Sequence, residues 1–151
     1  IELDPQRYEM LVLGDEVLAP FAAPAADGRP LHPLPGSPAH PLPYLGYAPG
    51  AYLGRMVDWL LRQAKAPVHL DRVYETDMAE GLKAMSLEGH GIAFLPSSAV
   101  RKELRAHKLV PAGGDLEMAL DIRIYRERPV GSKSKRAVDR FWDDLARQLA
   151  G

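Results

Sequence analysis

The stretch TDMAEGLKAMSLEGHGIAFLP, residues 76–96, holds a helix pattern followed directly by a strand pattern. Met78, Leu82 and Met85 fall on one face at helical spacing, which predicts a helix with an apolar stripe. Gly89 is expected to end this helix, because glycine readily adopts the backbone that closes one. The apolar run 91–95 then predicts a short buried strand.

The start of this helix is expected at Thr76 or Asp77. Asp77 is followed three residues later by Glu80, a spacing that resembles a capping box. The helix therefore begins directly after the strand predicted over residues 68–75.

The same alternation of strand and helix continues on both sides. Further strands are predicted over 8–20, 42–47 and 116–124, and further helices over 51–63, from 96–98 through Leu104, and from Ser134 to Leu149. The first of these helices opens after Pro49-Gly50 and shows its apolar residues at Tyr52, Met56, Val57, Leu60 and Leu61, with Gln63 on the same face. The last has its apolar set at Val138, Phe141, Trp142, Leu145 and Leu149. Alternating elements predict an α/β fold with a largely parallel sheet.

A proline-rich segment separates the first two strands. Eight prolines lie between residues 20 and 43, a density that predicts a surface loop with no helix or central strand. The run 8–20 before it is interrupted by Gly14-Asp15-Glu16, so it is either a strand pair or one long bent strand.

The amino-acid composition of the chain excludes several classes of function. The chain has 151 residues, 46% hydrophobic and 26% charged, with a net charge of -1 and no cysteine. Nucleic-acid binders usually carry a basic excess, so DNA contacts are expected outside this segment. Disulfides and thiolate zinc sites are excluded. No apolar run reaches membrane-spanning length. The sequence begins with Ile1 and not with methionine, and its first residues lack the features of a signal peptide. We therefore expect a cytoplasmic piece of a longer protein.

Catalytic and metal patterns are not found. The histidines, at positions 32, 40, 69, 90 and 107, lack ligand spacing, so no metal or other cofactor is expected. Ser97-Ser98 lacks the glycines of a nucleophile elbow and is better explained by helix capping. Asp143-Asp144 is expected on a solvent face. The sequence therefore predicts no enzyme.

One feature suggests a ligand site. Helices are predicted to begin after strand ends at Pro49-Gly50 and at Thr76-Asp77. Ligands of open α/β sheets lie beyond the carboxyl ends of strands, and helix N-termini offer N–H groups to anions. Gly50 would let a ligand approach the backbone and the Thr76 hydroxyl could donate to it. A plain cap or turn at each place is an equally good interpretation of these residues alone.

The segment 76–96 also resembles the effector domain of LysR-type transcriptional regulators, in which a helix ends in Gly-x-Gly and an aliphatic strand closes with Leu-Pro. The similarity continues through Glu103-Leu104, 108–110, 120–126 and the helix with Phe141-Trp142, and upstream over 44–55. Together these segments extend over essentially the whole chain.

The resemblance implies a periplasmic-binding-protein-like (type II) fold, in which two α/β lobes are joined by two crossover strands. The crossovers are expected near 16–21 and 116–122. Residues 1–16 would then be a remnant of lobe I, 17–118 the complete lobe II, and 119–151 the C-terminal part of lobe I. The N-terminal half of lobe I and the winged helix-turn-helix lie outside this chain.

The resemblance also implies a small-molecule effector in the interlobe cleft. One side of that cleft is expected to be formed by Tyr47, Ala48, Pro49, Gly50, Thr76 and Asp77, with Leu120 contributing from the return crossover. Tyr52-x-Gly54-Arg55 and the Asp77-Met78 helix look most like a hypochlorite-responsive branch, which makes Met78 a candidate oxidant sensor. Leu53, however, stands where a second methionine is expected, and Met78 is more simply explained as part of a buried helix stripe with Leu82 and Met85.

Partners follow from the same resemblance. The intact regulator is expected to be a homodimer or tetramer that contacts DNA only through the helix-turn-helix, with helix 51–63 packing on the partner and with no membrane contact. Two other functions remain open: a periplasmic solute-binding protein, which would carry a signal peptide, and an enzyme on the same scaffold, which would need convergent acid and base groups.

Overall fold

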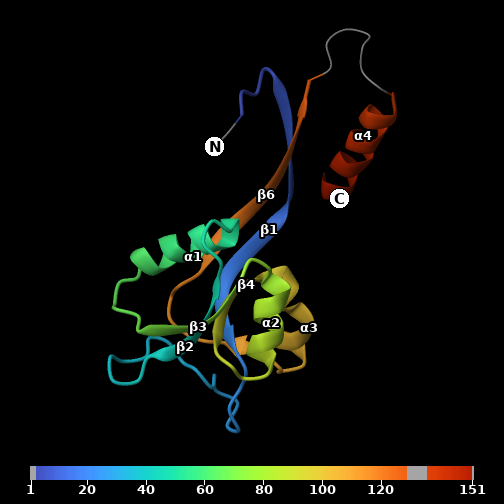
Figure 1. Cartoon of the computed structure of the whole chain (residues 1–151). Coiled ribbons are helices and arrows are strands. Elements are labelled where there is room, and N and C mark those ends of the chain that lie inside the picture. The colour runs from blue at the N-terminus through green and yellow to red at the C-terminus, as the bar shows by residue number, and fades with distance from the viewer. Residues whose placement is uncertain (1–2, 129–135, 151) are drawn as a thin grey trace. The chain divides into compact units, whose positions relative to one another are not determined.

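The computed structural model describes residues 3–128 and 136–150, and its α/β fold has the predicted alternation of elements (Figure 1). The strands are β1 (Tyr8–Ala22), β2 (Leu42–Tyr47), β3 (Leu70–Thr76), β4 (Ile92–Pro96), β5 (Val110–Pro111) and β6 (Met118–Glu127). The helices are α1 (Tyr52–Arg62), α2 (Ala79–Leu87), the short 3-10 turn η1 (Ser97–Ala99), α3 (Arg101–Arg105) and α4 (Arg136–Ala150). In the described part of the chain no helix is long and apolar enough to cross a bilayer.

The chain divides into two compact units. One comprises residues 17–119 and the other residues 1–16 with 120–151. Both β1 and β6 run from one unit into the other, since the unit boundaries fall at Glu16/Val17 and Ala119/Leu120.

The sheet is mixed, with the order β3-β2-β4-β1-β5, and β6 pairs with β1. β2 runs parallel to β3 and β4, whereas β1 runs antiparallel to β4 and β5. The predicted parallel sheet is therefore correct only for β3-β2-β4. The alternation of strands and helices could not reveal that β1 runs antiparallel to β4. The segment after β1 is a proline-rich loop, and its sequence does not indicate the direction in which the next strand runs.

The core of the unit 17–119 is centred on β4. Ile92 through Leu95 are fully buried, and the Phe94 ring meets Tyr44 edge-on at 6.2 Å between centroids. Gly91 permits this packing, since a Cβ there would lie 2.5 Å from the Pro43 carbonyl oxygen of the adjacent β2. A side chain at this position would push the two strands apart.

Residues 8–22 form one long strand, so of the two interpretations the single strand is correct. Pro20 lies inside it, opposite Phe94, although the sequence predicted no central strand among the prolines. The Pro20 carbonyl accepts from the Ala112 N–H at 3.0 Å, on the side away from β4. The missing N–H of proline faces the same side as its carbonyl, so the ladder between β1 and β4 is intact.

The predicted caps are wrong. The N-cap of α2 is Met78, without a side-chain hydrogen bond, and not the Asp77 of a capping box. Ser97 does not cap the following turn either, because its Oγ accepts from the Val17 N–H at 3.0 Å. Both side chains matched a cap motif, but the Ser97 hydroxyl has a tertiary partner and the helix α2 begins one residue later than the motif requires.

The unit of residues 1–16 and 120–151 is organised by Arg126 on β6. The guanidinium contacts Glu9 and Asp139 at 2.7 Å each and stacks on the Trp142 ring 5.1 Å away. These contacts fix α4, and Trp142 is buried. The rest of the predicted apolar face is not buried as a set, since Val138, Phe141 and Leu149 are exposed in this chain. Ser134 lies outside the described residues.

An ion pair joins α2 to α3. Lys83 Nζ lies 2.7 Å from Glu103 Oε1, and the two side chains are only 20% and 13% exposed. The hydrogen bond from Lys83 lowers the pKa of Glu103. The charged carboxylate therefore contributes stability above the pKa of an unfolded glutamate, and this contribution is lost as the pH falls through the lowered value.

We predict that Glu103→Gln lowers the urea midpoint of unfolding at pH 7. The difference from wild type should shrink as the pH falls below the usual pKa of a glutamate and through the lowered pKa of Glu103, because Glu103 itself then becomes protonated. Asp27→Asn is the matched control, since Asp27 and Arg29 form a solvent-exposed pair at 3.9 Å. Equal midpoints for wild type and Glu103→Gln at pH 7 would contradict the prediction.

Candidate ligand-binding site

The carboxyl ends of β2 and β3 lie side by side. Tyr47 pairs with Thr76 in the parallel register, and the Ala48 N–H donates to the Thr76 carbonyl at 2.9 Å. Segment 47–50 and segment 76–77, both predicted from the sequence to contribute to a ligand site, are therefore adjacent at one edge of the sheet.

A helix begins just beyond each of these strand ends. The N-caps are Ala51 for α1 and Met78 for α2, and neither provides a side-chain hydrogen bond to its helix. Helix geometry leaves the first N–H groups of each helix without an intrahelical acceptor. Two helix N-termini with their partial positive charge thus face the same edge of the sheet, which is suited to an anionic group.

Thr76 and Gly50 have the properties that a ligand contact would need. Thr76 Oγ1 accepts from the Met78 N–H at 3.3 Å, so its own proton is left to donate. Gly50 adopts a φ of +86°, and a Cβ there would meet nothing within 4 Å, so the space beside it is open. Asp77 is exposed. Met78 is 63% exposed and does not belong to a buried stripe; Leu82 and Ser86 form the buried face of α2.

Tyr47 offers only its main chain at this edge. Its side chain is buried and donates from the phenol to the Phe94 carbonyl at 2.8 Å. Burial raises the pKa of Tyr47 well above its usual value, and burial likewise raises the pKa of Tyr44 to about 12. Both phenols are therefore neutral donors over the physiological pH range.

Leu120, the remaining predicted contact, is buried on β6 and belongs to the unit of residues 1–16 and 120–151. Within the unit 17–119, the structure brings together the contacts predicted on segments 47–50 and 76–77.

Sequence reasoning missed Arg72, which supports the strand ends. Its guanidinium donates to the Tyr47 carbonyl at 2.8 Å and to Glu75 Oε1 at 3.1 Å, and it stacks on the Tyr44 ring 5.1 Å away. Its spacing from Glu75 gave no signal, because residues three apart on a regular strand point to opposite faces of the sheet. Spacing along one strand also does not identify a partner on another strand.

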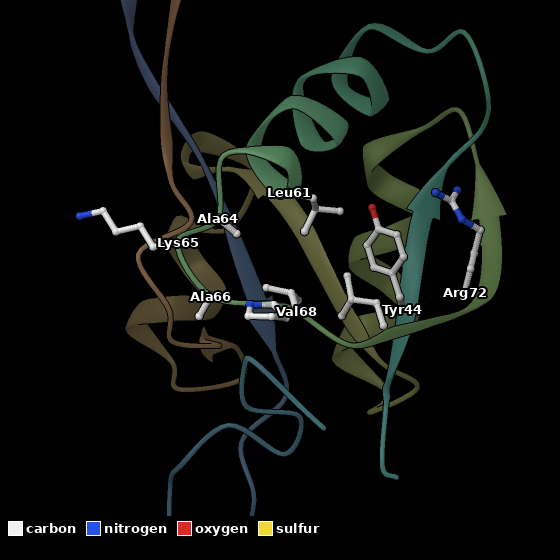
Figure 2. A pocket seen from close by; sticks show the side chains of 9 residues that line it. Tyr44, Leu61, Ala64, Lys65, Ala66, Val68 and Arg72 are labelled. Carbon is white, nitrogen blue, oxygen red and sulfur yellow. The ribbon is translucent and has the colours of Figure 1, made fainter. Parts of the chain in front are cut away.

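The sequence also did not predict two pockets that the structure forms in the unit 17–119. The larger, of about 540 Å³, lies between the C-terminal end of α1 and the strands, and Figure 2 shows Tyr44 and Leu61 turned toward it while Lys65 points away. The second, of about 290 Å³, adjoins it across the turn of residues 64–68. Among the described residues, no group of three or more His, Asp or Glu side chains is placed to hold a metal ion.

The fold agrees with that of a family of known proteins. A family model described as the LysR substrate binding domain matches residues 2–150. The chain belongs to this family. The match favours the effector-domain interpretation of the sequence over a solute-binding protein of a transport system.

Individual relatives are similar over part or all of the chain. The HTH-type transcriptional regulator YjiE of Escherichia coli K12 is 32% identical over 94 residues, which is 62% of this chain and 30% of YjiE. The HTH domain-truncated transcriptional regulator QseD of Escherichia coli O157:H7 is 31% identical over 94 residues, 62% of this chain and 38% of QseD. The matched part of the chain therefore spans well under half the length of these curated relatives.

A solved structure is similar over nearly the whole chain. The full-length structure of HypT from Salmonella typhimurium, a hypochlorite-specific LysR-type transcriptional regulator, superposes with a TM-score of 0.81 and 27% identity over 95% of this chain and 47% of HypT. This agreement supports the two-lobe, periplasmic-binding-protein-like fold class predicted from the sequence.

The buried Tyr47 phenol yields a prediction. Tyr47→Phe leaves the Phe94 carbonyl without this donor and should lower the free energy of unfolding by about 1–2 kcal/mol, measured by urea denaturation. Tyr52→Phe is the control, because Tyr52 is exposed. Its change should cost under about 0.5 kcal/mol. A Tyr47→Phe variant as stable as wild type would show that this hydrogen bond contributes nothing.

Proposed function

We propose that the chain is the effector-sensing regulatory domain of a LysR-type DNA-binding transcription factor that acts in the cytoplasm. The observation that carries the proposal is the pair of uncapped helix N-termini beside the ends of β2 and β3. Family membership supports the regulatory role. In this proposal the chain performs no catalysis; its ligand acts by changing the activity of the intact regulator.

The two compact units are proposed to be the two lobes of the family fold. Residues 17–118 would be lobe II, residues 1–16 a remnant of lobe I, and residues 119–151 the C-terminal part of lobe I. The support is that β1 and β6, the elements shared by both units, run where the crossover strands are expected.

The effector is proposed to be a small molecule with an anionic group. Its charge would be held by the first-turn N–H groups of α1 and α2, and Thr76 Oγ1 would donate to it. The main chain of 47–50 would line the site, and Gly50 leaves room for a close approach. Asp77 and Leu120 are retained as proposed contacts on the strength of the family resemblance.

The intact protein is proposed to be an oligomer, a homodimer or tetramer, and to bind DNA through a helix-turn-helix outside this chain. The support within the chain is α1, which exposes Tyr52 at 59% and Trp59 at 44%. Exposed aromatic side chains on one helix are typical of a surface that a partner covers.

Acetate is the probe that tests the strand-end site. In an NMR titration of the chain, the largest amide shifts are expected at Leu53, Gly54 and Glu80, in the first turns of α1 and α2. Thr76→Val should weaken acetate binding about fivefold or more, whereas Thr76→Ser keeps the hydroxyl and should bind as wild type does. Shifts confined to other surfaces, or Thr76→Val binding unchanged, would contradict the assignment.

A second candidate function is oxidant sensing through Met78. Its thioether side chain is 63% exposed at the start of α2, beside Thr76, so it is accessible to oxidants in this chain. HypT, a structural relative, is hypochlorite-specific. Oxidation to the sulfoxide would make this side chain polar next to the proposed anion site.

Hypochlorite treatment followed by mass spectrometry tests this candidate. Met78 should be oxidised ahead of Met56 and Met85, which are less exposed. In the intact regulator, Met78→Ile should abolish the hypochlorite response, whereas Met10→Ile, at a methionine 42% exposed, should not. A normal response from Met78→Ile would exclude Met78 as the sensor.

A further inference from the structure

A pocket at the C-terminal end of α1 has no role in the function proposed above. It has a volume of about 290 Å³ and is lined by Leu34, Pro35, Gln63, Ala64, Lys65, Ala66, Val68, Gly114, Asp115 and Leu116. Three chain segments form its walls: the end of α1 with the turn after it, the proline-rich segment, and residues 114–116. All of them belong to the unit 17–119.

The walls are fixed by main-chain hydrogen bonds. The Leu34 N–H donates to the Ala112 carbonyl at 2.9 Å, which ties the proline-rich segment to the chain just before Gly114. The Pro35 carbonyl accepts from the His69 N–H at 2.9 Å, which ties the same segment to the start of β3. A pocket whose walls are already connected binds a ligand without a large ordering cost.

We propose that this pocket is a second ligand site, which takes a small, neutral, largely apolar molecule of about two fused rings. The size follows from the volume, because an apolar cavity of about 150 Å³ holds benzene and this one is roughly twice as large. The chemistry follows from Leu34, Pro35, Val68 and Leu116, which supply apolar walls.

The charges of the pocket favour a neutral ligand. Lys65 and Asp115 are its only charged lining residues in the described chain, both are exposed, and they have opposite signs. A ligand with a net charge of either sign would gain one attraction and one repulsion.

The site is separate from the strand-end site. That site lies at the N-terminal end of α1, and this pocket lies at the C-terminal end. The length of α1, which runs from Tyr52 to Arg62, separates the two by about 15 Å, because an α-helix rises by about 1.5 Å per residue. The pocket also contacts Leu116, which is buried and lies two residues before β6 begins at Met118. A ligand against Leu116 therefore contacts the segment that leads directly into a strand shared by both units.

Indole is the probe that tests the pocket. In an NMR titration of the whole chain, indole should bind with a Kd on the order of 1 mM, as ligand efficiency allows for so small a molecule. The amide shifts should fall at Gly114, Leu116 and Met118. Indole-3-acetate and tryptamine, with charges of opposite sign, should each bind more weakly.

Two variants fill or cover the pocket. Leu116→Phe adds volume from the buried wall, and Gln63→Trp covers the pocket from an exposed position where loss of folding is a smaller risk. Each should weaken indole binding about tenfold or more. Leu70→Phe is the matched control, because Leu70 lines only the first pocket, and it should change the Kd less than about twofold.

The proposal is overturned if the chain does not bind indole at millimolar concentration, if Gln63→Trp binds it as wild type does, or if a charged analogue shifts the Gly114 and Leu116 amides with a lower Kd than indole does. Its failure is distinguishable from failure of the strand-end site, since acetate binding and the Thr76→Val effect involve none of the pocket residues.

Discussion

The close approach of β2 and β4 is the constraint on which the rest of the unit 17–119 depends. At Gly91 a Cβ would lie 2.5 Å from the Pro43 carbonyl, so only glycine allows the two backbones to pair here. The strand β2 pairs with β4 on one side and with β3 on the other. The register between β2 and β3 places Tyr47 opposite Thr76. The strand ends, the starts of α1 and α2, and the Arg72 contact with the Tyr47 carbonyl all follow from this arrangement.

At the strand ends, the proposed ligand site would come at the cost of helix stability. An Asp or Ser at the N-cap typically stabilises a helix by about 1 kcal/mol. Yet α1 begins after Ala51 and α2 after Met78, and neither side chain makes a capping hydrogen bond. Both helices are instead stabilised by packing, through Val57 and Leu60 in α1 and through Leu82 in α2. N–H groups left without a cap remain available to a ligand, which is the usual reason that binding sites depart from the most stable sequence.

The sequence predicted the elements well because their patterns are local. The helical spacing of Leu82 and the strand pattern over 116–124 depend on neighbours in the chain, and both appear in the structure, as α2 and β6. Such local patterns could not predict contacts between residues that are far apart in the sequence. Arg72 meets the Tyr47 carbonyl across a strand pair, and Ser97 binds Val17 where a helix cap was predicted. The exposure of Phe141 also could not be predicted from periodicity. Periodicity indicates that a helix has an apolar face, but it does not indicate whether other residues of this chain cover that face.

The placement of two proposed ligand sites at the ends of α1 has a thermodynamic consequence. Suppose that α1 moves as a rigid body between two positions on the sheet. A ligand that binds at the N-terminal end of α1 and prefers one position then changes the affinity of the C-terminal pocket for its own ligand. Linkage requires the reverse effect to be equal in free energy. Such coupling needs a difference in affinity between two positions of the helix, and a ligand that binds both equally shifts neither. The short distance favours the effect, because about 15 Å of continuous helix transmits a displacement with little loss. Tyr52 and Trp59 are exposed on α1, so a partner that covered them would restrict such a movement.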